Sequence, residues 1–152
     1  MTNKPLTLEE FKGIYSKVPR LCVDLIISTP NGIVLTLRDL PDYNNMWHFP
    51  GGTVFYRERI EDAVARISKA EIGVEVEIVK FLGYMEFMSE VKERGYGYTV
   101  SLGILCFTKN EDLVVNEDAS KVNAFKELPE NVIAEQKEFL EKHWDLVKEK
   151  FS

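Results

Sequence analysis

The sequence predicts a mixed β-sheet covered by helices, an α/β (α+β) fold arranged as an α/β/α sandwich. Three observations support this fold class. Several runs of β-branched and apolar residues have the length of strands, two segments repeat apolar residues with the period of a helix, and these segments alternate as helix, strands, helix, strands, helix. The 152 residues contain no repeat, low-complexity tract or linker-like stretch. Residues 1–152 are therefore expected to form a single domain.

The first expected element is a short amphipathic helix outside the main sheet. Thr7 precedes Glu10 by three residues, which is the spacing of a capping box. The helix is expected to end before Pro19. Its apolar side is formed by Phe11, Ile14 and Tyr15.

A β-hairpin is expected next, because β-rich runs at 21–28 and 33–37 flank a turn-rich sequence at 29–32. A short extended piece at 47–50 then leads into a glycine pair at 51–52. The helical period of residues 60–72 predicts the central helix, which Gly73 is expected to end.

The last part of the chain predicts two long strands and a helix. Residues 76–88 and 97–108 are β-prone and are expected to pair across a loop at 90–95. A final helix is expected over about 132–150, with apolar residues on one side: Ile133, Phe139, Leu140, Trp144, Val147 and Phe151.

Charge and composition exclude some classes of function. Lys and Arg total 19 against 25 Asp and Glu, a formal net charge of −6, which disfavours a protein that binds the backbone of a nucleic acid. Nucleotides stay open, because they need only local cations. The longest apolar runs are far shorter than the ~20 residues of a membrane span, and the first residues lack the apolar stretch of a signal peptide. We therefore expect a cytoplasmic protein without a membrane partner.

Two cysteines occur, Cys22 and Cys106, and both lie inside apolar runs. This placement is typical of reduced thiols in a core and not of a disulfide framework or a metal site. A cytoplasmic protein is consistent with it.

Glu71 is a residue that packing alone does not explain. At about 100° per residue, the helix at 60–72 places Glu71 in the middle of its apolar stripe. A carboxylate taken out of water needs a guanidinium, a metal ion or an opening to solvent. Arg66 lies at the edge of the stripe and is one candidate partner. A glutamate tolerated at a loosely covered helix end is the alternative reading.

The glycine pair upstream of this helix adds to the case for a ligand site. Gly51 and Gly52 let the backbone pass close to a ligand and leave carbonyl oxygens for a hard cation, and Glu58 offers a further oxygen donor. A glycine pair alone is weak evidence. Its value rises because a loop carboxylate and the helix carboxylate Glu71 follow it in one unit.

At this point the sequence resembles a known family. The run GGTVFYRERIEDAVARISKAEIGV at 51–74 is similar to the Nudix box, with matches at Gly52, Glu58, Arg66, Glu71, Gly73 and Val74. Ile67 and Ala70 stand where the box usually has glutamates. This shortened box resembles that of the GDP-mannose mannosyl hydrolases within the Nudix hydrolase superfamily, and the likeness extends over roughly residues 8–128.

The resemblance implies a Nudix-like fold, a homodimer and a one-metal site. One Mg²⁺, or Mn²⁺ in its place, is expected to be held by the substrate diphosphate, by Glu71 and by a backbone oxygen of Gly51, with Glu58 as a further donor. A single protein carboxylate suits Mg²⁺, which prefers a few protein oxygens together with phosphates and waters.

The same resemblance implies attack of water on the anomeric carbon and departure of a nucleoside diphosphate. Arg38 matches the arginine that stabilises charge on the leaving group. Asp24 matches an acidic residue near the sugar, and Arg66 is expected to orient nearby carboxylates.

Some positions depart from the subfamily. Thr53 stands where a second arginine follows the glycine pair, and we keep it as a substrate contact. His48 closely precedes the glycine pair and is also expected to contact substrate, whereas His143 in the last helix is expected to be structural or solvated.

The general base is the largest departure. When the following strand of the subfamily is aligned through Phe125, the loop histidine of the subfamily falls near Ser120 in this sequence. Asp118, or its neighbour Glu117, is the expected substitute.

The resemblance thus implies a Mg²⁺-dependent Nudix hydrolase that acts on a nucleoside diphosphate linked to another group, above all a nucleotide sugar of the GDP-mannose type. The partner is a small-molecule nucleotide and not a nucleic acid. Two alternatives stay open: attack at phosphorus on a nucleoside triphosphate or dinucleotide, and a nucleotide-binding Nudix domain with little turnover.

Overall fold

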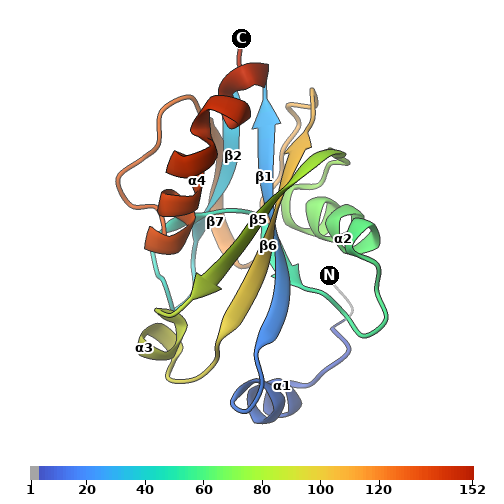
Figure 1. The fold of residues 1–152 in the computed structure, drawn as a ribbon, viewed down its shortest axis with the longest axis vertical. Helices are drawn as coiled ribbons and strands as arrows, with labels where there is room; N and C mark the ends of the chain where they lie inside the picture. The colour runs from blue at the N-terminus through green and yellow to red at the C-terminus, as the bar shows by residue number, and fades with distance from the viewer. Residues whose placement is uncertain (1–3) are drawn as a thin grey trace.

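A computed structural model describes residues 4–152. Four helices and seven strands follow one another along this part of the chain, with a short 3₁₀ helix at the end (Figure 1). Their bounds are α1 Leu8–Tyr15, β1 Arg20–Thr29, β2 Gly32–Arg38, β3 Trp47–His48, β4 Gly51–Thr53, α2 Ile60–Ile72, β5 Glu77–Phe87, α3 Glu90–Arg94, β6 Thr99–Phe107, β7 Ala119–Phe125, α4 Ala134–Val147 and η1 Lys148–Lys150.

The seven strands form one mixed sheet in the order β3-β2-β1-β6-β5, with β4 added to β1 and β7 added to β2. β1 and β6 run parallel and the other pairs are antiparallel. β1 changes partner along its length, because Asp24 pairs with Gly51 of β4 while Ser28 pairs with Ile33 of β2. The glycine pair is thereby fixed beside the middle of the central strand.

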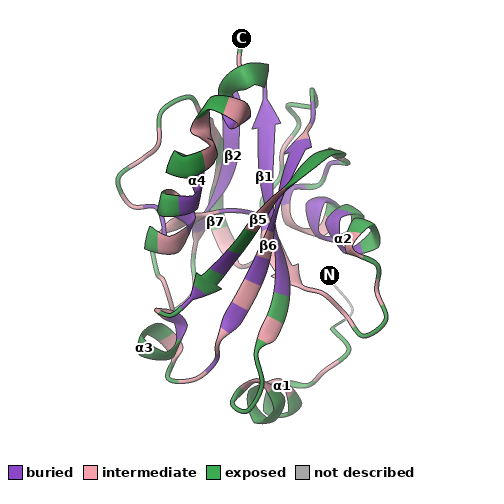
Figure 2. Ribbon diagram, viewed as in Figure 1, coloured by how far each residue is buried: buried purple, intermediate pink, exposed green. Residues whose placement is uncertain are grey.

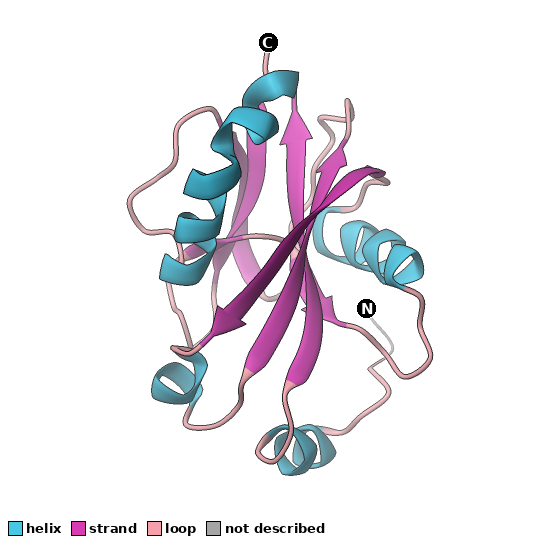
Figure 3. Cartoon of the chain, viewed as in Figure 1, coloured by secondary structure: helices cyan, strands magenta, loops and turns pink. Residues whose placement is uncertain are grey.

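Helices α2 and α4 lie on opposite sides of the sheet (Figure 3), and each covers its own core. One core packs α2 against β1 through Val23, Leu25 and Val64 among others. The other packs α4 against the opposite face through Ile26, Leu35 and Leu140 among others. The upper half of β1 is buried throughout (Figure 2). The predicted α/β/α sandwich with a mixed sheet is confirmed.

Several local predictions are confirmed together with the fold. The capping box of α1 forms in both directions between Thr7 and Glu10, and α1 has no buried residue, as expected for a helix outside the sheet. α2 ends at Gly73, whose φ of 74° is the left-handed conformation that glycine favours. Cys22 and Cys106 are free and buried.

Three elements differ from the prediction. The expected loop at 90–95 contains the short helix α3, because Glu90 is buried against Thr99 and Arg94. The last α-helix begins at Ala134 and not at 132, since Val132 forms a bridge with Trp47. The residue pattern predicted no strand at 119–125, where β7 pairs with β2; only the family resemblance implied one.

None of the helices described is both long enough and apolar enough to cross a membrane.

Candidate active site

A cavity of about 1270 Å³ opens beside the glycine pair. Its walls come from β1, β4 and β6, from the C-terminal end of α2, from the loop at 116–118 and from α1 with the residues before it. Every predicted catalytic residue lines this cavity: Asp24, Arg38, Arg66, Glu71 and Asp118. The structure therefore brings together residues from β1, β2, α2 and the loop before β7, which are far apart in the sequence.

Glu71 faces this cavity from the last turn of α2, half-buried and without an ion-pair partner among the salt bridges of residues 4–152. Burial raises the pKa of Glu71 to about 7, and the nearby carboxylate of Asp118 adds to the rise, while Arg38 and Lys4 oppose it. Two carboxylates that repel each other beside an open cavity form a site that a cation would stabilise.

Arg66 is not the partner of Glu71, and that part of the sequence analysis was wrong. Its guanidinium donates to both carboxylate oxygens of Glu58, Nε to Oε2 at 2.8 Å and Nη2 to Oε1 at 2.9 Å, and Nη2 also donates to the carbonyl oxygen of Thr53. Phe55 stacks on the guanidinium with 3.7 Å from Cζ to the ring centroid. The helix wheel could not show this, because the partner lies in a loop that turns back over the helix.

Glu58 has no oxygen left uncommitted. Besides the two bonds from Arg66, its Oε1 accepts a hydrogen bond from the backbone N–H of Phe55 at 3.0 Å. The hydrogen bonds from Arg66 hold the pKa of Glu58 below its usual range. This geometry gives Glu58 a role in shaping the loop between β4 and α2, and the expected role as a further metal ligand finds no support in it.

Gly51 presents an unpaired backbone to the cavity. Leu25 N–H donates to Pro50 C=O and Val54 N–H donates to Leu21 C=O, so Leu25–Pro50 and Leu21–Val54 are hydrogen-bonded pairs of the β1–β4 ladder. Hydrogen-bonded and non-hydrogen-bonded pairs alternate along an antiparallel ladder. The facing pair Asp24 and Gly51 is therefore a non-hydrogen-bonded pair. In an antiparallel ladder such a residue points its own N–H and C=O away from the partner strand. The carbonyl oxygen of Gly51 is therefore available as a ligand.

Asp24 is packed directly against this glycine. A Cβ at position 51 would overlap Oδ1 of Asp24, so the carboxylate requires glycine there. Burial raises the pKa of Asp24 to about 7, although Ser101, Arg20 and Gln136 favour its charged form. The acid predicted from the resemblance thus lies inside the cavity and not on a solvated strand face.

Arg38 is held by a residue that the sequence analysis did not identify. Its Nε donates to the carbonyl oxygen of Asp42 at 2.7 Å, and its Nη2 donates to Oδ2 of the same residue at 2.6 Å. Asp42 lies in the loop between β2 and β3, four residues after Arg38. An Arg–Asp spacing of four within a loop carries little signal, since the same spacing is common by chance.

His48 has a partner at each ring nitrogen. Nδ1 lies 2.7 Å from the carbonyl oxygen of Phe49 and must donate to it, so Nε2, 3.2 Å from Thr36 Oγ1, is the acceptor. Burial, with a contribution from Arg38, lowers the pKa of His48 to about 4. A neutral ring with both nitrogens occupied leaves its carbon edge for a ligand.

Thr53 also lines the cavity, and its hydroxyl accepts a hydrogen bond from Nη1 of Arg20 at 3.1 Å. Arg20 further donates to Thr99 and lies 3.8 Å from Glu90. The position after the glycine pair thus has a guanidinium beside it, supplied by the first residue of β1.

The residues present fit a divalent ion that arrives with its own oxygen ligands. One uncommitted carboxylate, Glu71, and one free backbone oxygen, at Gly51, face the same space. Within residues 4–152 no three His, Cys, Asp or Glu side chains converge on a point where they could hold a metal. This donor set suits Mg²⁺, which keeps waters and substrate phosphates in its shell.

Comparisons with known proteins identify the family of this chain. The family model described as "NUDIX domain" matches residues 18–148. A curated relative, the low-salt glycan biosynthesis protein Agl8 of Haloferax volcanii, is 35% identical over 94 residues, which is 60% of this chain and 60% of the relative. The chain thus spans less than two thirds of the length of that relative.

Solved structures share the fold. The MutT NUDIX hydrolase from Burkholderia pseudomallei superposes with a TM-score of 0.72 at 22% identity, covering 82% of this chain and 98% of the other. The NUDIX domain of Shewanella oneidensis NrtR, solved with ADP ribose, gives a TM-score of 0.69 at 17% identity, covering 93% of this chain and 99% of the other.

Proposed function

From the premise that this chain belongs to the NUDIX domain family, we propose that it is a Mg²⁺-dependent hydrolase of a nucleoside diphosphate linked to another group. The observation that carries the proposal is the pair Glu71 and Asp118. Two carboxylates share a cavity with the free backbone oxygen of Gly51, and they repel each other until a cation joins them.

We propose that Glu71 and the carbonyl oxygen of Gly51 hold the ion, with the diphosphate completing its shell. The ion, when bound, neutralises charge that develops on the diphosphate. Mn²⁺ is expected to substitute for it. Glu58 and Arg66 position this site: they fix the loop between β4 and α2, and Arg66 also binds the backbone of Thr53.

Other side chains of the cavity are proposed to stabilise the leaving group, to activate water and to contact the substrate. Arg38 faces the same space as Glu71 and supplies a fixed positive charge for the leaving diphosphate. Asp118, with Glu117 beside it on the cavity wall, is proposed as the general base that accepts a proton from the attacking water. Thr53 and the carbon edge of His48 are proposed as substrate contacts.

The proposed substrate is a nucleotide sugar, with GDP-mannose as the first compound to test. The shortened box supports it, as does the glycan-biosynthesis name of the Haloferax relative. Asp24 is proposed to contact the sugar, since it is a buried carboxylate packed against Gly51 in the cavity. The products would be the free sugar and a nucleoside diphosphate.

A nucleotide-binding domain with little turnover is the second candidate. The sparse acid set favours it, because no three acidic or metal-binding side chains converge within residues 4–152. Ligand-dependent thermal stabilisation without product would identify this case.

Hydrolysis in ¹⁸O-labelled water tests the proposal. The protein is incubated with Mg²⁺ and with GDP-mannose, ADP-ribose or a nucleoside triphosphate, and the products are analysed by mass spectrometry. Label in the sugar means that carbon was attacked and supports the proposal in full. Label in a phosphate supports a hydrolase but contradicts the proposed attack at carbon. The absence of product with all substrates contradicts the proposal that the protein is an enzyme.

Two further expectations from the sequence are kept as proposals. The resemblance leads us to propose a homodimer, which light scattering of the purified protein tests. Cytoplasmic location is proposed from composition and is tested by cell fractionation.

A further inference from the structure

Two buried polar atoms at the inner end of the cavity have no partner. Within residues 4–152, Asp24 Oδ2 and Ser101 Oγ are the buried side-chain oxygens or nitrogens that lack a hydrogen bond. Asp24 is 7% exposed and Ser101 0% exposed, and both line the cavity. The Ser101 hydroxyl lies close enough to Asp24 to lower the pKa of that carboxyl, but no hydrogen bond of good geometry joins the two groups. Because an unpaired buried oxygen costs free energy, a ligand hydroxyl or a water between them would supply the missing bonds.

The sheet brings these two side chains to the same face. β1 and β6 are parallel neighbours in which Cys22 pairs with Ser101 and Asp24 pairs with Gly103. Side chains two residues apart on a strand share a face. Ser101 is therefore the diagonal neighbour of Asp24. The place directly beside Asp24, over Gly103, is filled by the ring of Phe139.

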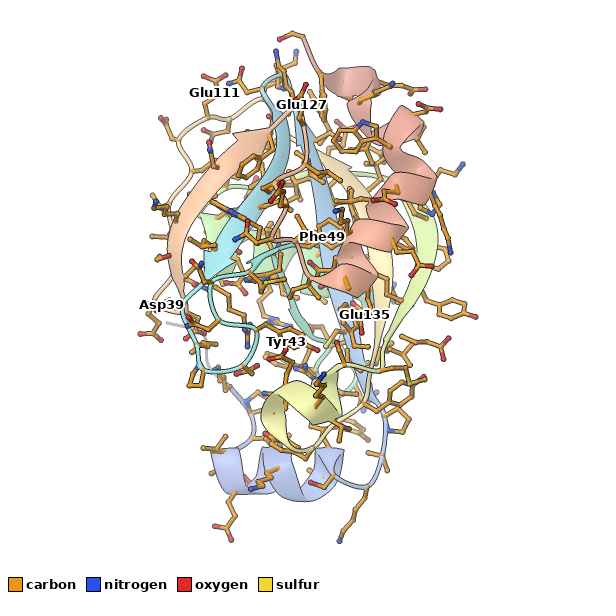
Figure 4. All side chains as sticks on the ribbon, turned by 90° about the vertical axis from the view of Figure 1, so that its left-hand side faces the viewer. Asp39, Tyr43, Phe49, Glu111, Glu127 and Glu135 are labelled. Carbon is orange, nitrogen blue, oxygen red and sulfur yellow. The ribbon has the colours of Figure 1, made fainter. Side chains whose placement is uncertain are left out.

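Gln136 adds a third polar group. It is 4% exposed at the first turn of α4, and its Oε1 accepts a hydrogen bond from the backbone N–H of Phe49 at 2.9 Å. Phe49 lies beside this turn of α4 (Figure 4). With Oε1 committed, the amide NH₂ is left as a donor, and Gln136 is near enough to Asp24 to favour its charged form.

We propose that Ser101, together with Asp24 and Gln136, forms a specificity subsite for the hydroxyl groups of a neutral sugar ring. The inference rests on the proposed nucleotide-sugar substrate. The donors and acceptors match hydroxyls, which both donate and accept. A phosphate is disfavoured by the carboxylate of Asp24, and an ammonium group is disfavoured by Arg20, which acts on the same carboxylate.

The sugar that this subsite takes is the one attached beyond the diphosphate, and not the ribose of the nucleoside. Asp24 connects the two parts of the site, because Oδ1 lies against Gly51 while Oδ2 is unpartnered. A group bound at Ser101 would therefore contact the same carboxylate that lies against Gly51, the proposed ligand of the ion.

Binding of GDP-mannose and of GDP to Ser101→Ala, measured by calorimetry with Mg²⁺, separates the sugar from the ribose. We expect affinity for GDP-mannose to fall about tenfold and affinity for GDP to change less than about twofold. Equal losses for both ligands, or no loss for either, would overturn the inference. The matched control is Ser28→Ala, which removes a buried serine hydroxyl that donates to Val147 C=O at 2.8 Å outside the cavity.

A second readout does not depend on nucleotide binding. Crystals soaked in mannose should show sugar hydroxyls bonded to Asp24 Oδ2 and Ser101 Oγ, and matched Ser101→Ala crystals should show none at position 101. Ordered water in place of sugar in the wild type would overturn the subsite. If sugar binds there but no nucleotide is turned over, the proposed function is contradicted and the sugar subsite is still supported.

Discussion

Arg66 holds Glu58 by two parallel hydrogen bonds of 2.8 and 2.9 Å. Because the Arg66 guanidinium is bonded to Glu58, it does not pair with Glu71, the partner that the helix wheel suggested. The consequence is a division of labour between two glutamates of one motif. Glu58 fixes the loop, and Glu71 faces the cavity without an ion-pair partner among residues 4–152.

Replacing Arg66 by lysine should destabilise the fold although the charge is kept. Lysine cannot donate two parallel bonds to Glu58 and also bind Thr53, so we expect a loss of about 1–3 kcal/mol in the free energy of unfolding. Urea denaturation measures it. Arg59→Ala is the control, because its pair with Glu61 is 3.8 Å long and highly exposed; an equal loss there would refute the special role of Arg66.

Replacing Glu71 by glutamine should abolish activity and spare the fold. The neutral amide cannot support a metal site, so turnover should fall at least about 10²-fold. The melting temperature without metal should stay the same or rise, since an unpaired, half-buried carboxylate is removed. Glu75→Gln, at an exposed position, should change neither quantity. Retained turnover in Glu71→Gln would remove this residue from the mechanism.

The stability of the metal-free protein should depend on pH through Asp24 and Glu71. Their pKa values are raised to about 7 from 3.8 and 4.5, so between about pH 4 and pH 7 the folded state binds more protons than the unfolded state. Their stabilising contribution is full below pH 4 and is lost as the pH rises through 7. The double variant Asp24→Asn/Glu71→Gln should lack this decline.

The titration of His48 changes the stability with pH in the opposite direction, so its contribution must be separated from that of the two acids. Its pKa is lowered from 6.5 to about 4, so its contribution is present above pH 6.5 and is lost as the pH falls through 4. Repeating the pH series of thermal melts in His48→Gln isolates the decline that belongs to the two acids. If that decline persists unchanged in the double variant, the two acids are not its source.

Asp42→Asn should strengthen binding of a nucleoside diphosphate. Asp42 neutralises Arg38 through a 2.6 Å contact, and the amide keeps the shape of the side chain without its charge. We expect affinity for GDP with Mg²⁺ to rise about twofold to fivefold at low salt, with the gain shrinking as salt is added. Weaker binding would mean that Asp42 serves mainly to position Arg38.

The surroundings of this loop show how it is held. Tyr43 lies near the end of α4 that faces α3, and Glu135 belongs to the first turn of α4 (Figure 4). Both bond to Ser89, with 2.7 Å from Tyr43 Oη to Ser89 Oγ and 2.7 Å from Ser89 Oγ to Glu135 Oε2. The loop that carries Asp42 is thus tied to two helices.

Local chemistry predicted much of the fold. The side chains of Thr7 and Glu10 each accept a hydrogen bond from the other residue's backbone N–H, and Gly73 ends α2 because of its own backbone freedom, so both features can be predicted from sequence. The half-burial of Glu71 follows from helical period alone. These features depend on residues a few positions apart.

Features set by distant residues were not predictable. α3 depends on Glu90 meeting Arg20 and Thr99 from other strands. Ser101 lies near Asp24 only because of the register of β6 against β1, which the sequence does not show. The polar residues Thr99 and Ser101 at alternate positions of an apolar strand are a signal that could have been followed. The single-domain expectation for residues 1–152 stays a prediction.

Binding of Mn²⁺ to wild type and to Glu71→Gln in the presence of GDP, followed by electron paramagnetic resonance, tests the central claim most directly. We predict one tightly bound Mn²⁺ per chain in the wild type and a large loss of affinity in the variant. Equal affinity and stoichiometry in the two proteins would contradict a metal site at Glu71.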